Sequence, residues 1–470
     1  MTRGARPLAA AMPAPLSGRH DSDSIGALAA EVARLAWPAI VQGLVATLVF
    51  LVDRIMLGRY STDALASMQV SGPVLWSIYV VFTAFSSGTV AVVGRAIGAR
   101  DAERATKAIA SVVALAIAIG AVVGIAGFFG RHVIARVLTE SPATSDAVRA
   151  LSARYMAIIF PFWPFLFAGI IGVTALQASG DTRTPLLVSL LASAIKIGGN
   201  AILIFGLFGA PRLGVAGAAI ATACAFTCEG LVVLWVLSRR RGPARLVFER
   251  PGPAHREALR SVLRVSGPAF AEKALHHGGF LVYVALIGRL GDTAMAANQA
   301  LVAIESIGFM TAEGFAVASG AIVAQKLGAR RPREAARCGW IVAGMAVGLL
   351  SLASIVFLLA PRLLMSLFTS EPSIVALGAR CLVIAAVAQP LMAMADNFSA
   401  ALRGAGDTKN PMRVALTGPV LVRIGATWLF AFALGWGLFG VWLGSTLDWL
   451  VRAAWLAVVF RRGRWKTIAV

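Results

Sequence analysis

The sequence contains few charged residues. Only 14% of its 470 residues are Asp, Glu, Lys or Arg, whereas 58% are hydrophobic, and the mean hydropathy is +0.80. About a quarter of the residues in an ordinary soluble domain are charged, so this composition excludes a typical soluble protein. The sequence also lacks the alternation of polar and apolar residues that is typical of membrane β-barrel strands.

Cysteines and the short motifs of enzymes are scarce as well. The chain has four cysteines. Cys224 and Cys228 lie one helical turn apart, but no further Cys or His accompanies them to complete a metal site. We expect them to pack as small apolar side chains. Because no metal cluster, nucleophile motif or phosphate loop occurs in the sequence, we expect neither an enzyme nor a bound cofactor.

Long apolar runs recur along the whole chain. Runs of more than roughly 18 apolar residues are typical of transmembrane helices, which satisfy their own backbone hydrogen bonds in lipid. Twelve such runs lie near residues 35–57, 70–94, 106–129, 150–177, 185–208, 214–238, 262–287, 297–323, 338–360, 374–401, 412–434 and 438–460. The sequence therefore predicts an all-α membrane protein with twelve transmembrane helices.

The net charge of +21 is unevenly placed. Arg and Lys concentrate in every second loop, for example at 239–245 and 326–333, and in the tail at 461–466. This positive-inside pattern predicts that both termini are cytoplasmic, here in a bacterial inner membrane. The charge thus indicates topology and contact with anionic lipids, and we expect no nucleic-acid partner.

The N-terminal segment differs from the spans. The stretch 1–30 contains prolines and no uninterrupted apolar core, so it does not form a cleavable signal. Ile25, Leu28, Val32 and Leu35 fall on one helical face. This spacing predicts a short interfacial helix that leads into the first span.

Two loops have almost the same sequence. ALQASGDTRTP at 175–185 recurs as ALRGAGDTKNP at 401–411, at a spacing of 226, and we call these two segments the GDT loops. IGARDAERA at 97–105 matches LGARRPREA at 327–335 at a spacing of 230. One deletion of four residues reconciles the two spacings. The chain is therefore predicted to contain two copies of one six-helix unit.

Each copy has an even number of spans, so both copies enter the membrane in the same direction. This predicts two parallel six-helix repeats, related by a pseudo-twofold axis along the membrane normal. The expected boundaries are a cytoplasmic tail with the start of the interfacial helix at 1–30, an N-terminal lobe at 31–238, a basic cytoplasmic linker at 239–260, a C-terminal lobe at 261–460 and a cytoplasmic tail at 461–470. The GDT loops fall at equivalent cytoplasmic turns, and we interpret them as connectors.

Ionisable residues within predicted spans are costly and by default line a cavity or pair with one another. In the N-terminal lobe these are Asp53, Lys196 and Glu229. Asp53 either faces a cavity or is neutralised by its neighbour Arg54. Lys196 precedes Asn200 by four residues, so the two share a helical face. Lys196 then either forms an ion pair with Asp53 or repels cations from the lobe interior.

The C-terminal lobe contains more such residues. Glu272 and His276 lie one turn apart in the seventh span. Because His titrates near neutrality, this pair is able to handle protons, and the alternative is a packed pair that makes interhelical hydrogen bonds. Asp396 lies deep in the tenth span and is an equal candidate. Lys273, His277 and Arg423 also lie within predicted spans of this lobe, and the weaker candidates of the two lobes are Glu229, Glu305, Glu313 and Asp448.

The fourth span contains FPFWPF at 160–165. Its two prolines predict a kinked helix. The aromatic side chains either line a site for flat amphipathic compounds or pack within the protein.

Several of these stretches together resemble the multidrug and toxic compound extrusion (MATE) family of transporters, in the multidrug/oligosaccharidyl-lipid/polysaccharide flippase superfamily. They are VDRIMLG at 52–58, IFGLFGAPRLGVAGAAIAT at 204–222, AANQALVAIESIGFM at 296–310 and the two GDT loops. The resemblance covers roughly residues 30–460. It implies export of organic cations or other amphipathic compounds, driven by inward H⁺ or Na⁺.

The resemblance also implies roles for single residues. Asp53 matches the first-span aspartate of the family, which couples cations, and Asn200 matches a fifth-span asparagine. Lys196 departs from the polar, uncharged residue common at its position, and its fixed positive charge disfavours Na⁺. One bacterial branch of the family has acidic residues at the positions of His276 and Met392, which this chain does not retain. Glu272 and Asp396 lie one turn away from those positions and are the candidates instead.

We therefore expect a secondary active efflux transporter that works by alternating access of its two lobes. It would act as a monomer and exchange H⁺, rather than Na⁺, for amphipathic or cationic substrates. The residues expected to couple cations or bind substrate are Asp53, Lys196, Asn200, Glu272, His276 and Asp396. The alternative is a flippase for a lipid-linked sugar or another polar lipid, whose cavity would be lined with Arg and Lys.

Overall fold

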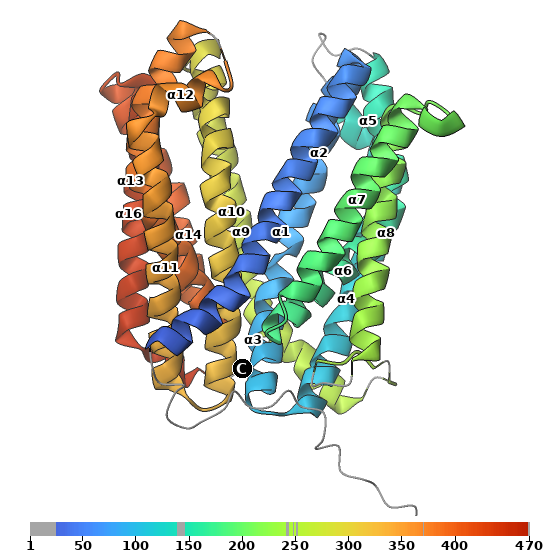
Figure 1. Ribbon diagram of the computed structural model, residues 1–470, viewed down its shortest axis with the longest axis vertical. Coiled ribbons are helices and arrows are strands. Elements are labelled where there is room, and N and C mark those ends of the chain that lie inside the picture. The colour runs from blue at the N-terminus through green and yellow to red at the C-terminus, as the bar shows by residue number, and fades with distance from the viewer. Residues whose placement is uncertain are drawn as a thin grey trace, which may run out of the picture.

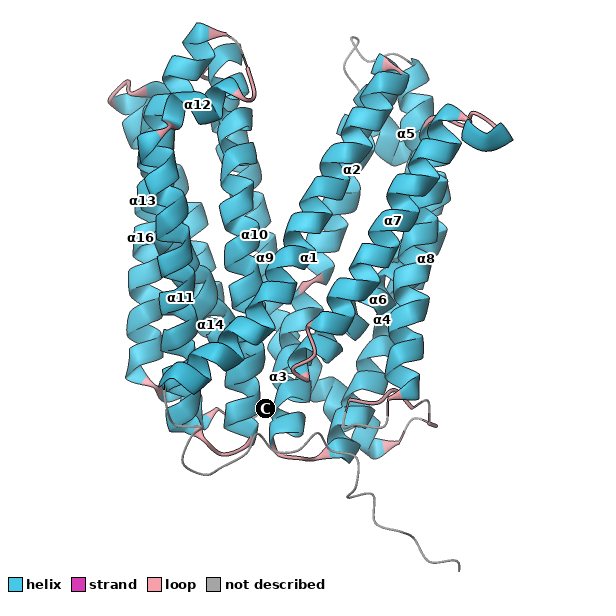
Figure 2. Ribbon diagram, viewed as in Figure 1, coloured by secondary structure: helices cyan, strands magenta, loops and turns pink. Residues whose placement is uncertain are grey.

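The computed structural model describes residues 25–138, 146–240, 244–247, 249–250, 252–369 and 371–468. These residues form helices joined by loops, without a strand (Figure 2), which confirms the all-α prediction. The first helix begins and the last helix ends at one end of the molecule (Figure 1). We call it the basic end, because the segments 95–107, 326–337 and 461–466 are rich in Arg and Lys.

The helices of the first half are α1 (Ile25–Tyr60), α2 (Thr62–Phe82), α3 (Ala84–Gly98), α4 (Ala102–Leu138), α5 (Asp146–Ile159), α6 (Trp163–Ala178), α7 (Arg183–Phe205) and α8 (Val215–Arg239). Those of the second half are α9 (Pro253–Gly288), α10 (Asp292–Gly328), α11 (Pro332–Leu359), α12 (Pro361–Ser366), α13 (Pro372–Gly404), α14 (Lys409–Ala415), α15 (Arg423–Thr427) and α16 (Gly437–Arg462). Two π-helical segments, Leu416–Val422 and Trp428–Ala433, flank α15.

Within the described residues, 11 helical segments are long and apolar enough to cross a membrane. The helix α9 occupies the place of the predicted seventh span. Its 36 residues are long enough to cross, but charged and histidine residues such as Glu272 and His276 lower its hydropathy. The chain is thus a multi-pass helical membrane protein.

Helix boundaries confirm the two-repeat architecture. The helices α2 and α10 begin at the spacing of 230, as do α4 and α11, whereas α7 and α14 begin at the spacing of 226. The turns repeat as well. Arg100 and Arg330 both have a φ of 59°, and Gly180 and Gly406 have φ values of 86° and 87°. Left-handed backbone is rare outside glycine, so its recurrence at the predicted offsets shows that one unit is folded twice.

The helices form two lobes that approach each other at the basic end and diverge toward the opposite end (Figure 1). The N-terminal lobe has one apolar core, to which α4, α5, α6 and α8 contribute most of the buried side chains. The C-terminal lobe has one core near the basic end and a second core near the opposite end. Each lobe therefore has an interior of its own.

The first helix of each lobe begins on the other lobe. In α1, Val32 packs into a core of the C-terminal lobe, whereas Leu57 belongs to the N-terminal core. In α9 the order is reversed, with Val262 in the N-terminal core and Tyr283 in a C-terminal core. The two lobes are thus joined by a reciprocal exchange of helix ends.

This exchange corrects one expectation from the sequence. In the described part of the chain the predicted interfacial segment is not separate from the first span, because residues 25–60 form one continuous helix. Leu28, Val32 and Leu35 are at most 3% exposed and pack in a core with α10 and α11. Three residues of the apolar face that predicted a helix at the membrane surface are therefore buried in protein, whereas Ile25 is 75% exposed.

The FPFWPF segment is kinked, as its two prolines predict. The helix α5 ends at Ile159, a 3₁₀ turn covers Phe160–Phe162, and α6 starts at Trp163. Phe160 and Trp163 are at most 1% exposed and belong to the N-terminal core. Of the two alternatives for these rings, the structure shows packing.

Candidate functional site

In the N-terminal lobe, three candidate residues meet at one place. Asp53 of α1 is 6% exposed, and Asn200 of α7 is 1% exposed. The side-chain amide of Asn200 donates a 2.7 Å hydrogen bond to Asp53 Oδ1, and Lys196 Nζ lies 3.6 Å from Asp53 Oδ2. Each carboxylate oxygen therefore has its own partner, and both partners come from α7.

The local helix geometry explains this arrangement. Residues four apart on a helix lie on one face, and α7 packs along α1, so Lys196 and Asn200 both reach Asp53. Arg54 is oriented differently, since its guanidinium carbon lies 4.9 Å from the ring centre of Phe50. Among the described residues, the ion pair of Asp53 is with Lys196 and not with Arg54.

The electrostatics of this cluster define what it can do. A buried carboxylate without a partner costs several kcal/mol, and the ammonium of Lys196 offsets that cost. The Lys196 side chain is 19% exposed, whereas that of Asp53 is 8% exposed, so the lysine is the member that reaches toward water. Protonating Asp53, or placing another cation against it, would release Lys196. The cluster is therefore able to exchange one positive charge for another.

In the C-terminal lobe, Glu272 pairs with a residue that the sequence analysis did not single out. Arg403 Nη1 of α13 lies 2.6 Å from Glu272 Oε1 and donates a second 2.6 Å hydrogen bond to Ser399 Oγ. Among the described residues no hydrogen bond joins Glu272 to His276, and the contacts of Glu272 with Ser399 and Arg403 are interhelical, as the second alternative expects. Proton handling by Glu272 and His276 stays a prediction. A guanidinium makes a stronger, charge-assisted bond to a carboxylate than a neutral imidazole does.

A second buried cluster lies between α15 and α16. Asp448 is 2.8 Å from Arg423 and 3.2 Å from Arg452. Asp448 is 0% exposed, and both arginines are 7% exposed. The guanidinium of Arg452 lies 3.6 Å from the ring centre of Trp449, and that of Arg423 lies 5.4 Å from the ring centre of Tyr283. Two positive charges thus share one carboxylate and two aromatic faces.

The sequence analysis ranked Asp448 low and did not name Arg452. A signal was present, because an acid and an arginine four residues apart in an apolar helix form a natural pair. The candidates His276 and Asp396 lie close enough to this cluster to interact electrostatically with Arg452. Both candidates therefore lie near the charge of Arg452.

The backbone is adapted to the Asp448 cluster. The segments on both sides of α15 are π-helical, and such wider turns are frequent at functional sites. The helix α7, which is the counterpart in the other repeat, is a regular α-helix. A Cβ atom on Gly418 would collide with the side chains of Asp448 and Arg452. Only glycine leaves room for the cluster at that position.

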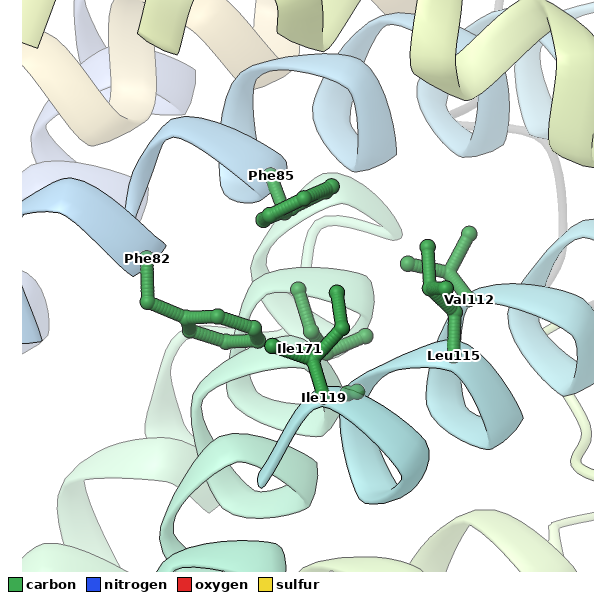
Figure 3. A pocket seen from close by; sticks show the side chains of 7 residues that line it. Phe82, Phe85, Val112, Leu115, Ile119 and Ile171 are labelled. Carbon is green, nitrogen blue, oxygen red and sulfur yellow. The ribbon is translucent and has the colours of Figure 1, made fainter. Parts of the chain in front are cut away.

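A small pocket in the N-terminal lobe has a different character. Its lining includes Phe82, Phe85, Val112, Ile119 and Ile171 (Figure 3). All of its lining side chains are apolar. The pocket can therefore fit an apolar ligand by shape, but it has no hydrogen-bonding or charged side chain to bind one. We do not assign the coupling chemistry to it.

No group of three or more His, Cys, Asp or Glu side chains in the described part of the chain is placed to hold a metal ion. Cys338 and Cys381 are buried in the C-terminal lobe, whereas Cys224 is exposed on the surface of α8 and Cys228 is half-buried. The expectation that Cys224 and Cys228 pack as small apolar side chains is thus wrong for Cys224 and only half met by Cys228.

Repeated six-helix lobes, each with a buried charge cluster, are the architecture of secondary membrane transporters. The model of the MatE family matches residues 38–202 and 268–429. These stretches, one in each lobe, together make up more than half of the chain. The chain belongs to the MatE family, the family of MATE transporters that its motifs resemble.

Its relatives are similar over nearly their full length. A probable multidrug resistance protein NorM of Thermotoga maritima is 27% identical over 448 residues, which cover 94% of each chain. A protein with the same name from Pseudomonas aeruginosa is 28% identical over 93% of this chain and 89% of its own. The uncharacterized transporter YisQ of Bacillus subtilis is 26% identical over 92% and 93%, respectively.

Solved structures share the fold. An outward-facing multidrug resistance MATE family transporter of the MOP superfamily has a TM-score of 0.85 at 22% identity, covering 93% of this chain and 95% of its own. A MOP superfamily transporter from Pyrococcus furiosus, described as having a binding pocket of reverse polarity, also has a TM-score of 0.85 at 22% identity, covering 94% and 97%. The overall two-lobe fold is therefore that of MATE transporters.

Proposed function

We propose that this chain is a secondary active exporter of amphipathic or cationic organic compounds, driven by H⁺ antiport. The observation that carries the proposal is the cluster of Asp53, Lys196 and Asn200, buried in one lobe of a chain that belongs to the MatE family. Relatives named as probable multidrug resistance proteins support this substrate class.

The preference for H⁺ over Na⁺ follows from Lys196. Its ammonium lies 3.6 Å from Asp53, so a metal cation that approached the carboxylate would be repelled at short range. A proton instead removes the charge of the carboxylate itself and releases the lysine. Moving one charge through 100 mV supplies roughly 2.3 kcal/mol, which is enough to bias two lobe orientations appreciably.

In the proposed cycle, Asp53 takes up a proton from the outer side while substrate leaves. The loss of its ion pair changes the contacts between α1 and α7, and the lobes reorient to open the basic end. Deprotonation there restores the pair with Lys196 and favours binding of the next substrate. Binding between the two lobes, both of which α1 and α9 contact, fits the usual placement of sites in transporters built from repeats.

The test is transport in liposomes that contain the purified full-length protein. We expect an imposed pH gradient to drive accumulation of a fluorescent lipophilic cation, and a Na⁺ gradient alone to have no effect. Asp53→Asn should reduce transport to background, whereas Asp146→Asn, at an exposed surface position, should transport normally. Transport that requires Na⁺ and ignores a collapsed pH gradient would contradict H⁺ coupling.

A flippase remains the second candidate because of the C-terminal lobe. Arg403, Arg423 and Arg452 share two paired carboxylates there, and guanidiniums suit an anionic lipid headgroup, whereas Glu305 and Asp396 of the same lobe disfavour it. The discriminating measurement is the movement of a fluorescent anionic lipid between the leaflets of the same liposomes. Accelerated movement without transport of the lipophilic cation would favour the flippase.

We further propose that the protein is a monomer in a bacterial inner membrane, with the basic end in the cytoplasm. The basic segments gather at the end where α1 begins and α16 ends (Figure 1), as the positive-inside rule requires. A membrane-impermeant thiol reagent should label a cysteine placed at Arg461 only after the cells are opened. Labelling in intact cells would reverse the orientation.

A further inference from the structure

Two helices cross where the lobes meet at the basic end. Gly98 at the end of α3 lies directly against the backbone of Gln325 in α10, and Gly328 lies directly against the backbone of Arg95. Residues 95 and 325, like 98 and 328, are equivalent in the two repeats. A Cβ atom at either glycine would overlap the opposite backbone. The crossing therefore lies near the pseudo-twofold axis and is as close as two helices can come.

Arg95 extends from this crossing to the other lobe. Its Nη2 donates a 2.7 Å hydrogen bond to the carbonyl of Ala405, and its Nη1 donates a 2.6 Å hydrogen bond to the carbonyl of Ile468. Ala405 caps the C-terminus of α13. The last carbonyls of a helix have no partner within it and carry partial negative charge, so a guanidinium binds well there.

Gln325 makes the reciprocal contact. Its side-chain amide donates a 2.7 Å hydrogen bond to the carbonyl of Ala178, the last residue of α6 in the N-terminal lobe. Ala405 directly precedes the Gly-Asp-Thr of its GDT loop, and Ala178 lies one residue further from that of the other loop, with Ser179 between them. The repeated loops thus end two helices whose final carbonyls receive a donor from the opposite lobe.

The C-terminal tail takes part on one side only. Trp465 is 0% exposed and stacks on Phe460, with ring centres 4.7 Å apart. Its indole nitrogen donates a 2.8 Å hydrogen bond to the carbonyl of Phe460, and Phe460 stacks on Phe398 of α13. These contacts fix the tail to the C-terminal lobe and hold the carbonyl of Ile468 within reach of Arg95 in the last turn of α3.

We infer that Arg95, Gln325 and the tail at 464–468 form a latch that holds the basic end of the two lobes together. The inference rests on the proposed function, because alternating access requires this end to open once in each cycle. Arg95 is then a positioning residue. It stabilises the conformation closed at the basic end, and its release is part of reorientation. The tail strengthens the latch by supplying a second carbonyl to one guanidinium.

The latch is tested by measuring the separation of the lobes. Spin labels at Ala102 of α4 and Arg333 of α11, both exposed near the basic end, are attached to full-length protein in lipid nanodiscs after the four native cysteines are replaced. We expect Arg95→Gln to raise the ratio of separated to joined lobes about tenfold, as loss of charge-assisted hydrogen bonds implies. Gln325→Leu should act in the same direction and less strongly. The control Arg464→Gln, at an exposed position in the same tail, should leave the distances unchanged.

The outcomes separate the parts of the proposal. Unchanged distances in Arg95→Gln would overturn the latch, even if transport proceeds as proposed. A shift in distances without any transport would support the latch and contradict the proposed function. Trp465→Ala is expected to shift the distances in the direction of Arg95→Gln, and if it does not, the tail is no part of the latch. Should Trp465→Ala fail to fold, Arg95→Gln and Gln325→Leu still decide the question.

Discussion

The N-terminal lobe holds one buried carboxylate, Asp53, between a lysine and an asparagine. The C-terminal lobe instead distributes the carboxylates of Glu272 and Asp448 among three arginines. Both lobes follow the same helix plan, so the difference lies in the side chains that each repeat places inside. The same arrangement of helices thus accommodates different buried charged residues in the two lobes, so the lobes are able to have different functions.

The two GDT loops, in contrast, make the same hydrogen bonds in both lobes. The backbone amide of Thr184 donates a 3.0 Å hydrogen bond to Asp181 Oδ1, and the backbone amide of Asn410 donates a 3.2 Å hydrogen bond to Asp407 Oδ1. Side-chain hydrogen bonds to the second carboxylate oxygen also recur, at 2.8 and 2.6 Å. Both aspartates cap the start of the next helix. The duplicated loop thus retains its structural chemistry while the charges inside the lobes have diverged.

The largest effect is expected from removing a carboxylate of the C-terminal lobe. If this lobe shares the coupling task, Glu272→Gln or Asp396→Asn will abolish export while the protein remains inserted, because the charge that balances the nearby arginines is lost. Export in liposomes and the amount of folded protein in the membrane are the measurements. The exposed Glu371→Gln is the control. Normal export by both variants would confine coupling to the N-terminal lobe.

The next largest effect concerns stability. Asp448→Asn should lower the free energy of unfolding by about 3–5 kcal/mol, since it leaves two buried guanidiniums without a counter-charge. Asp53→Asn should cost less, because Lys196 is 19% exposed and can be hydrated. Thermal unfolding of the detergent-solubilised protein compares the two. Replacing Asp448, Arg423 and Arg452 together with apolar residues should recover most of the loss. If Asp53→Asn and Asp448→Asn lowered the free energy of unfolding equally, the buried carboxylates of the two lobes would contribute equally to stability.

The smallest and most specific effect is expected from Lys196. Lys196→Met removes the ammonium that lies 3.6 Å from Asp53, and with it a repulsion of a few kcal/mol on any metal cation at the carboxylate. Sodium should then bind at least about tenfold more tightly and slow H⁺-driven export. The measurement is export as a function of Na⁺ concentration, with Lys107→Met as the control, a lysine that pairs with Glu103 at the surface. If Na⁺ affects neither the wild type nor Lys196→Met, Lys196 does not set the ion preference.

Particular contacts show where prediction from sequence succeeded. The pairing of Lys196 with Asp53 was one of two stated alternatives, because the spacing of Lys196 and Asn200 defines a helical face. The kink at 160–165 followed from prolines, and the repeat followed from matching loops. Each of these inferences uses residues close together in the sequence or a direct match between segments.

Other contacts escaped prediction because they join distant segments. Arg403 reaches Glu272 across 131 residues, and Arg95 reaches Ala405 across 310 residues. The apolar face of residues 28–35 was expected at the membrane surface, and the structure buries it against the C-terminal lobe. An apolar face indicates that one side of a helix is shielded from water. It does not identify whether lipid or another part of the protein lies against that side.

The sequence by itself determined the membrane-spanning helices, the duplication, the turns that join the helices and the candidate charges inside them. These features depend on hydropathy, on local backbone preferences and on comparison of one segment with another. Only the tertiary structure decided which charges pair, which lobe the ends of α1 and α9 contact, and that the two repeats meet through Gly98 and Gly328. Such contacts depend on the rotation and tilt of whole helices, and these are set by packing summed over many side chains at once.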